Sequence, residues 1–117
     1  MSDLNEEDSP EWHRHFAAVT NNRAWELSTQ DRTAKEDLEM LNAAHTSAYH
    51  WSSVGNELNR MRAIMLLAEV HTLLNLGSSA FIFAEEMKAF FTSNQTPDWE
   101  LAFTHTIHAH ASYIVDN

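Results

Sequence analysis

Eight histidines among 117 residues are the side chains of this sequence best suited to chemistry, because imidazoles bind metal ions and exchange protons near neutral pH. His45, His71, His105 and His108 lie in three separate helix-forming segments. Their convergence would create a metal site, completed by Glu69 or by water. The alternative is that each histidine is satisfied by ordinary hydrogen bonds in the core or at the surface. No HExxH pair and no cysteine is present, so we predict no catalytic residue and no cofactor.

Aromatic, arginine and histidine side chains are concentrated in two segments, residues 22–25 and 45–51. Such side chains are frequent anchors of protein interfaces, since they bury a large area at a low entropic cost. We therefore predict a surface for a protein or peptide partner, formed by Asn22, Arg23, Trp25, His45, Tyr49, Trp51 and Arg60. The alternative is that Trp25, Tyr49 and Trp51 are core residues that join the first two helices.

The elements that must position these side chains are helices, because two glycines, two prolines and no strand-like alternation indicate an all-α fold. A serine followed by a proline at residues 9–10 predicts the start of a helix that ends near Ser28. Thr33 and Glu36 fit a capping box, which predicts a second helix that ends near Trp51.

Three further helices complete the expected set of about five. The third, from about Glu57 to Leu76, is apolar on most sides, and Gly77 is expected at its C-terminal cap. Ser78 is expected to begin the fourth helix, so the link is short and the two helices form an antiparallel hairpin. Thr96 before Pro97 predicts the cap of a fifth helix, which runs from Asp98 nearly to the end of the chain.

Apolar side chains predict the face that each of the first two helices buries. On the first helix they are Trp12, Phe16, Val19 and Leu27, and on the second they are Leu38, Leu41, His45, Ala48 and Tyr49. Small residues are expected where helices approach closely, because alanine lets two backbones come near each other. These residues are Ala43, Ala44, Ala48, Ala68, Ala80, Ala84, Ala102 and Ala109.

The charge of the chain limits its partners. There are 17 acidic and 7 basic residues, which gives a formal net charge of −10, so we expect neither nucleic acid nor an anionic membrane to bind. Residues 1–9 are expected to form a disordered acidic tail, and residues 10–117 a single helical domain. The acidic start is unlike a signal peptide and no apolar run is long enough for a membrane span, so a cytoplasmic location is expected.

The segment 64–87 resembles a tetratricopeptide repeat, with Ala68 and Ala84 at small or packed positions and Asn75 where a turn glycine is usual. Residues 101–115 resemble the first helix of a second repeat, with Ala109 at the small position. Residues 21–27, 31–33 and 44–51 are similar to a family of small uncharacterised bacterial proteins of this helical type. The resemblance implies antiparallel hairpins in a right-handed stack and a role in binding a peptide or partner protein.

The last helix of such an array would leave one apolar flank uncovered. Its residues are Phe103, Ile107, Tyr113 and Ile114. Burial of this flank against a second copy is the simplest remedy, so we predict a homodimer. The sequence therefore favours a non-enzymatic interaction module, and the alternative is a small histidine-based metal-binding bundle or metal-dependent enzyme.

Overall fold

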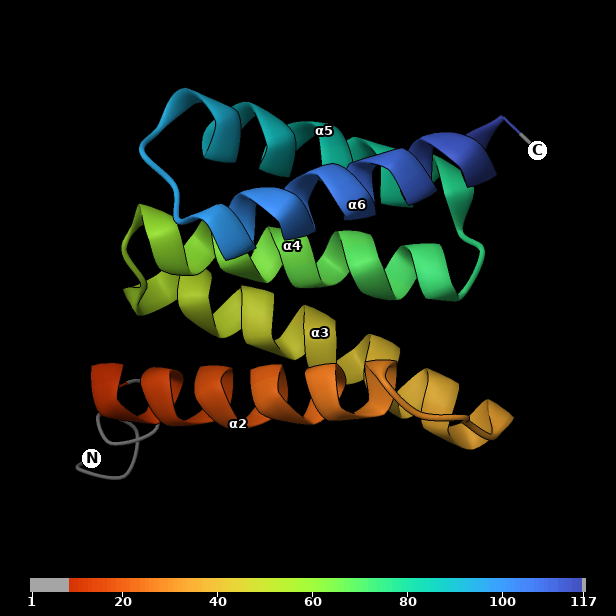
Figure 1. Cartoon of the computed structure of the whole chain (residues 1–117). Helices are drawn as coiled ribbons and strands as arrows, with labels where there is room; N and C mark the ends of the chain where they lie inside the picture. The colour runs from red at the N-terminus through yellow and green to blue at the C-terminus, as the bar shows by residue number, and fades with distance from the viewer. Residues whose placement is uncertain (1–8, 117) are drawn as a thin grey trace. The chain divides into compact units, whose positions relative to one another are not determined.

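The computed structural model describes residues 9–116, and in these residues it contains five α-helices and no strand (Figure 1). The helices are α2 (Pro10–Ser28), α3 (Ala34–Val54), α4 (Glu57–Leu73), α5 (Gly77–Ser93) and α6 (Asp98–Val115). The prediction of an all-α fold with about five helices is confirmed. The predicted tail over residues 1–9 lies outside the described residues except for Ser9, which caps α2.

Contacts within the chain divide it into two compact units, Met1–Ala63 and Ile64–Asn117. The first unit contains α2, α3 and the beginning of α4, and the second contains the rest of α4 with α5 and α6. The expectation of a single domain over residues 10–117 is not tested by this division and stays a prediction. Across residues 9–116, none of the helices combines the length and hydropathy that crossing a bilayer requires.

Local capping starts the helices of the first unit where the sequence predicts. The hydroxyl of Ser9 accepts a hydrogen bond from the backbone N–H of Trp12 at 3.3 Å, and Pro10 occupies the first helical turn. At the start of α3, Thr33 and Glu36 form the complete capping box, with N···O distances of 3.2 and 3.0 Å. These contacts satisfy backbone N–H groups that have no partner within the helix.

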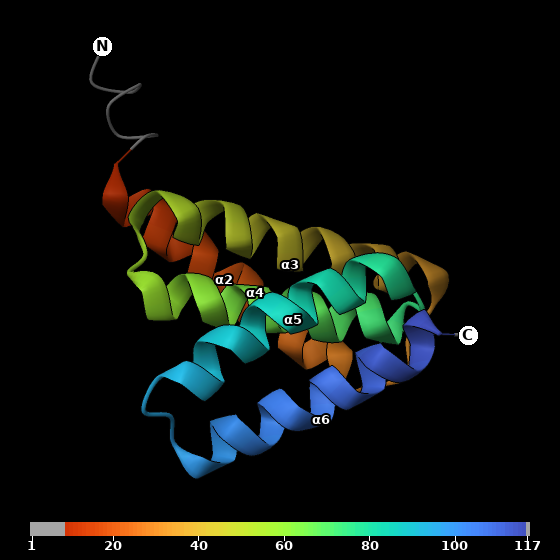
Figure 2. The same ribbon diagram turned by 90° about the horizontal axis from the view of Figure 1, so that it is seen from above.

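In the first unit, α2 and α3 form an antiparallel hairpin and lie side by side (Figure 2). The side chains of the hairpin that become buried are mostly small: Ala17, Ala24, Leu27, Met40, Ala43, Ala44 and Ser47. The hydroxyl of Ser47 donates a hydrogen bond to the backbone carbonyl of Ala17 at 3.0 Å, a contact that requires the two backbones to approach closely. Small residues therefore form the contact face of this hairpin.

The predictions of which face of α2 and of α3 is buried are partly wrong. Leu27 is buried as expected, whereas Trp12, Phe16 and Val19 are exposed on α2. On α3, Leu38, His45 and Tyr49 are exposed, and the buried residues lie on another face of the helix. The physical reason is that alanine and serine permit a closer interhelical contact than bulky side chains do, so the bulky residues lie at the surface.

The turn between α3 and α4 depends on Gly55 and on a pair of asparagines. Asn56 and Asn59 each accept a hydrogen bond from the other's backbone N–H, at 2.8 and 3.2 Å, and so cap the start of α4. A Cβ at Gly55 would lie 2.8 Å from the carbonyl oxygen of Trp51 and 2.9 Å from the Cβ of Asn59. No other residue fits there without displacement of the backbone, because these contacts are shorter than van der Waals distances.

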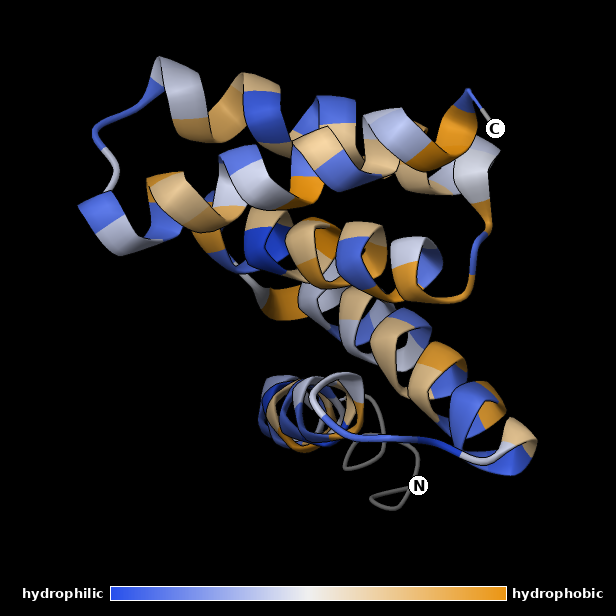
Figure 3. Ribbon diagram, turned by 45° about the vertical axis from the view of Figure 1, so that its right-hand side comes forward, coloured by the Kyte–Doolittle hydropathy of each residue, from blue (hydrophilic) through white to orange (hydrophobic). Residues whose placement is uncertain are grey.

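In the second unit, α5 and α6 form the contacting pair. Apolar residues recur along both helices between polar ones, as the hydropathy colouring shows (Figure 3). The buried residues of this pair are Ala80, Ala84, Met87, Phe91, Glu100, Thr104, Ile107 and Ala111. Ala80 and Ala84 are buried as predicted, whereas Ala102 and Ala109 are exposed and Ala111 is the small buried residue instead.

Two predicted caps in the second unit are wrong. Asn75 has a positive φ of 59° and closes the end of α4, whereas Gly77 is already the first residue of α5. A Cβ at Gly77 would lie 3.1 Å from the carbonyl oxygen of Ile114, so this glycine is needed for close approach to the end of α6. Thr96 does not cap α6, because its hydroxyl bonds to the carbonyls of Phe91 and Asn94 at 2.7 and 3.1 Å.

Candidate functional site

A continuous group of rings lies where the beginning of α2 meets the end of α3, and we call it the aromatic cluster. It consists of Trp12, His13, His15, Phe16, Tyr49 and His50. The rings of Trp12 and Phe16 are stacked with centroids 5.2 Å apart, and His50 lies 5.8 Å from Phe16 and 5.3 Å from Tyr49. The cluster therefore joins the two helices of the first unit through ring contacts at their ends.

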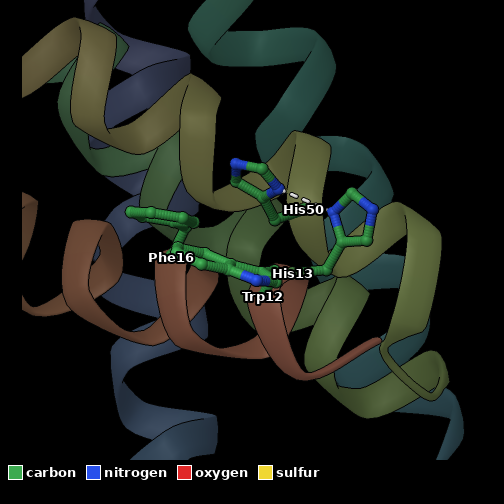
Figure 4. Close-up of a pocket in the computed structure, with 4 residues that line it drawn as sticks. All are labelled: Trp12, His13, Phe16 and His50. Atoms are coloured by element: carbon green, nitrogen blue, oxygen red, sulfur yellow. Dashed lines mark hydrogen bonds between the residues drawn. The ribbon is translucent and has the colours of Figure 1, made fainter. Parts of the chain in front are cut away.

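The centre of the aromatic cluster is a direct contact between two imidazoles. Nδ1 of His13 and Nδ1 of His50 are 2.8 Å apart, and the two rings point toward each other through these atoms (Figure 4). One nitrogen must donate and the other must accept, so the contact holds a single proton between the two rings. The pKa of His50 is lowered, first by burial and then by the positive charge of His13.

A pocket of about 450 Å³ opens over this contact, and it is lined by Trp12, His13, Phe16 and His50 (Figure 4). Its volume is within the range of small-ligand sites, and its walls combine apolar rings with two groups that can donate or accept hydrogen bonds. Trp12 and Phe16 are 45% and 38% exposed, and Tyr49 beside them is 66% exposed. The arrangement can bind an apolar or cationic side chain, because ring faces attract both.

The alignment of α2 with α3 separates the residues of the predicted partner surface into two areas. His13 lies opposite His50, and Arg23 lies opposite Glu39, to which its guanidinium donates two hydrogen bonds of 2.7 and 3.1 Å. About 15 Å of helix separates Arg23 from His13, so the structure does not bring Arg23 to the end of α3 that carries Tyr49. Asn22 is exposed and Trp25 is half-buried on the same part of α2 as Arg23.

The charges around Arg23 form a small network at the surface. Its guanidinium also bonds to Glu26, and hydrogen bonds with Glu39 and Glu26 raise its pKa above the ordinary value. The same hydrogen bond from Arg23 lowers the pKa of Glu39. Exposed ion pairs of this kind contribute little to stability, so the network mainly holds the orientation of the side chains.

The remaining residues of the predicted surface lie at or near the end of α3. Tyr49 belongs to the aromatic cluster, and His45 is exposed one turn earlier. Trp51 is half-buried with its ring against the turn at Gly55, and Arg60 donates a hydrogen bond to the carbonyl of Gly55. Trp51 and Arg60 therefore stabilise the turn between α3 and α4.

The histidines of the metal alternative have other contacts. Nε2 of His108 lies 2.6 Å from a carboxylate oxygen of Glu85, His71 is buried beside Ser79, and His105 and His45 are exposed. Among residues 9–116, no three histidine, aspartate or glutamate side chains are grouped closely enough to hold a metal ion. In this part of the chain, His45, His71, His105 and His108 therefore do not form a group of three or more such side chains.

A serine and a histidine do come into contact in the second unit. Nδ1 of His71 lies 2.5 Å from the hydroxyl of Ser79, which in turn donates a hydrogen bond to the carbonyl of Leu76 at 3.2 Å. When the hydroxyl proton is directed at that carbonyl, the oxygen of Ser79 accepts a hydrogen bond from Nδ1–H of His71. The contact therefore holds the end of α4 against the start of α5.

Glu69 is a half-buried carboxylate of the second unit. Burial raises its pKa, and the charge of nearby His110 offsets part of this change. Glu69 lies on α4 and His110 lies on α6, so the pair connects two helices of this unit. Neither residue belongs to the aromatic cluster.

The residues predicted for a dimer interface do not share one environment. Phe103 and Tyr113 are 43% and 69% exposed on α6, whereas Ile107 is only 2% exposed and Ile114 is half-buried. The assignment of Ile107 to an uncovered flank is wrong, because its side chain already packs within the chain. The exposed part of the predicted flank is therefore aromatic and consists of Phe103 and Tyr113.

Sequence reasoning missed the His13–His50 contact and the place of Trp12 and Phe16 beside it. The spacing of Trp12 and Phe16 by four residues predicted a shared face, but that face was assigned to the core. The contact itself depends on the register between α2 and α3, for which the chain carries no local signal. Comparison with models of protein families, with curated proteins and with solved structures finds no match to this chain.

Proposed function

We propose that this protein is a non-enzymatic interaction module of the cytoplasm, and that the aromatic cluster binds a basic segment of a partner protein. The observation that carries the proposal is the group of large exposed rings, contributed by two helices, around one pocket. Trp12, Phe16 and Tyr49 are the residue types that most often dominate binding energies at protein interfaces.

The charge of the chain supports a basic partner. A net charge of −10 attracts a lysine- or arginine-rich segment over long distances and repels nucleic acid and anionic lipid. At short range, a guanidinium or ammonium group stabilises itself on the face of an indole or phenol ring by roughly 0.5–1 kcal/mol at an exposed site. Trp12 lines the pocket, Tyr49 contacts the ring of His50 in its wall, and both side chains are exposed.

A selection from a random peptide library tests the proposed surface. Peptides are displayed, selected on the immobilised wild-type chain, and counted by sequencing. The peptides enriched on the wild type should be rich in lysine and arginine, and their affinity should fall by roughly tenfold or more for Trp12→Ala and Tyr49→Ala. Tyr49→Ala should leave the melting temperature nearly unchanged, because this side chain is largely exposed, and Trp12→Ala should lower it only slightly, because Trp12 is 45% exposed.

Ile82 provides the matched control, since it is a large apolar residue with 65% exposure in the other unit. Ile82→Ala should bind the selected peptides like the wild type. The proposal fails if no peptide is enriched over background. It also fails if the three variants bind equally well, because the aromatic cluster would then not be the contact.

We further propose that the chain forms a homodimer through the exposed rings of α6. Burial of Phe103 and Tyr113 against a second copy would remove two large aromatic side chains from water. Light scattering behind a sizing column should show a mass of twice 13.4 kDa at tens of micromolar, and Phe103→Glu should reduce the mass to that of one chain. A wild-type mass near 13.4 kDa at that concentration would contradict the dimer.

The proposed role agrees with the resemblance to tetratricopeptide-like proteins, which use stacked helical hairpins to bind peptides. Two contacting helix pairs, α2 with α3 and α5 with α6, supply hairpins of the kind from which such stacks are built. The aromatic cluster lies at one end of the first of these hairpins.

A further inference from the structure

The large exposed side chains of α6 lie along one line of the helix, which we call the α6 stripe. Its residues follow spacings of four, three, four and three positions, and they are Trp99, Phe103, Thr106, His110 and Tyr113. Because each residue of a helix turns by about 100°, these five positions lie within about 40° of a single line. All five side chains are exposed, and the rings of Trp99, Phe103 and Tyr113 are exposed by 61%, 43% and 69%.

The face by which α6 packs within the second unit is a different one. Its buried residues lie about 110° around the helix from the α6 stripe. They are Glu100, Thr104, Ile107 and Ala111. The helix therefore has one face that is packed within the chain and a second face on which large rings meet water.

The exposed surface of α6 carries little charge. Eight residues between Asp98 and Asp116 are exposed, and none of them is an aspartate, glutamate, lysine or arginine. Glu69 of α4 is near His110, but it is half-buried and burial raises its pKa. Two copies of a chain with a net charge of −10 repel each other, so contact through a face without exposed acids lowers the cost of pairing. A basic segment, by contrast, finds no exposed carboxylate among these residues.

We propose that two copies of the chain pair through the α6 stripe, with their α6 helices antiparallel and a two-fold axis at Thr106. This inference rests on the homodimer proposed above and adds its geometry. Trp99 of one copy then meets Tyr113 of the second copy, and Phe103 meets His110, so that rings pack on rings. Thr106 is small and lies where the two backbones are closest. The antiparallel direction also opposes the two helix dipoles and keeps the two His110 side chains apart.

The area of the α6 stripe fits a dimer of modest affinity. An aromatic side chain buries about 150–250 Å², so the exposed parts of the three rings amount to roughly 350 Å² in one chain and roughly 700 Å² in two. Thr106 and His110, with Ala102 and Ala109 beside the stripe, bring the contact to about 1,000 Å², the lower limit for a specific interface. The dimer should therefore dissociate on dilution through the micromolar range.

Single cysteines test this geometry, because the chain has no cysteine of its own. Thr106→Cys, at tens of micromolar in an oxidising glutathione buffer, should form a disulfide-linked dimer on a non-reducing gel, since a residue at a two-fold axis contacts its own copy. His110→Cys should stay unlinked, because its two copies would lie about 12 Å apart along the helices and a disulfide requires Cα atoms within about 7 Å. His105→Cys is the matched control and should also stay unlinked, since this exposed residue lies about 100° around α6 from Thr106.

Each pattern of cross-links has a definite meaning. Cross-linking of both Thr106→Cys and His110→Cys would show parallel helices and overturn the proposed geometry. No cross-link at Thr106, with a wild type that is dimeric by light scattering, would place the dimer on another face and overturn the α6 stripe while the homodimer stands. A monomeric wild type would overturn both.

The dissociation constant of the dimer gives a second measurement, without cysteines. Trp99→Ala should raise this constant by roughly tenfold or more, whereas Ile82→Ala, at an exposed apolar residue of α5, should leave it unchanged. An unchanged constant for Trp99→Ala would overturn the proposal. Far-UV circular dichroism checks that every variant is folded. A basic peptide is not needed in any of these measurements, so their failure would leave the proposed peptide binding untouched.

Discussion

At His50, the folded chain opposes protonation. The ring is partly buried among other rings, and its Nδ1 faces that of His13 at 2.8 Å. When both imidazoles are protonated, two donors point at each other and the hydrogen bond is lost. His50 therefore has a distinct acid–base behaviour, although it is one of eight histidines in the sequence. The cause is its contact with residues of α2.

We expect the stability of the protein to depend on pH through His50. Its pKa is lower in the folded chain than the ordinary value of about 6.5, so the unfolded chain binds more protons in the interval between the two values. The free energy of unfolding should therefore rise with pH through this interval. The contribution of His50 to the free energy of unfolding is complete above about pH 6.5. It is lost as the pH falls toward the lower pKa of His50 in the folded chain.

Chemical denaturation at a series of pH values from 5 to 8 measures this dependence, and the histidines that do not contact His50 cancel when His50→Gln is compared with the wild type. The wild type should lose more stability than His50→Gln as the pH falls below about 6.5. Parallel curves for the two proteins would contradict the prediction. His105→Gln, which changes an exposed histidine of α6, should follow the wild type.

At the scale of the element, capping decides where the helices begin, and small side chains decide which face they bury. The Ser9 cap and the Thr33–Glu36 capping box are local contacts, within three residues of sequence. The α2–α3 contact instead depends on Ala17 and Ser47, thirty residues apart, which allow the hydrogen bond between the two helices. Consequently Trp12 and Phe16 lie outside the contact and are available for binding.

Thr33→Ala should lower the free energy of unfolding by about 1 kcal/mol, because the backbone N–H of Glu36 loses its acceptor at the start of α3. Urea denaturation measures the change. Thr106→Ala is a suitable control, since Thr106 is exposed within α6 and alanine is a better helix former. Thr106→Ala should be as stable as the wild type or slightly more so, and an equal loss in both variants would contradict the capping role.

At the scale of the whole molecule, charge is the dominant feature. Seventeen acidic residues face seven basic ones, and part of the basic set is paired locally, as Arg23 with Glu39 and Arg32 with Asp37 at 2.7 Å. The uncompensated negative charges repel one another in the folded chain. This repulsion opposes folding, whereas the same negative charge would attract the basic partner that we propose.

Salt should therefore stabilise the protein. An increase of ionic strength from about 0.01 M to about 1 M shortens the Debye length from about 30 Å to about 3 Å and so screens the repulsion. The melting temperature, measured by circular dichroism at pH 7, should rise over this range. A fall would mean that ion pairs such as Arg23–Glu39 outweigh the repulsion, and Arg23→Gln would then remove much of the effect.

The helices could be predicted closely because their signals are local. Ser9 with Pro10 and Thr33 with Glu36 begin helices where the sequence places them, and α2 ends at Ser28 as expected. The prediction of the C-terminal cap of α4 was wrong. Asn75, not Gly77, has the positive φ after α4. Asparagine tolerates this conformation nearly as well as glycine, so the order along the chain did not decide between them.

The candidate site depends on tertiary contacts. Tyr49 was predicted as a surface residue from its type and spacing, and it does belong to the aromatic cluster. Its neighbours were predicted as Arg23 and Trp25, whereas the structure places Phe16 and His50 beside one another and pairs His50 with His13. Helix formation follows from backbone hydrogen bonds and caps within a few residues, whereas the alignment of α2 with α3 follows from side-chain fit between residues some thirty positions apart. Only folding of the hairpin brings the two imidazoles together.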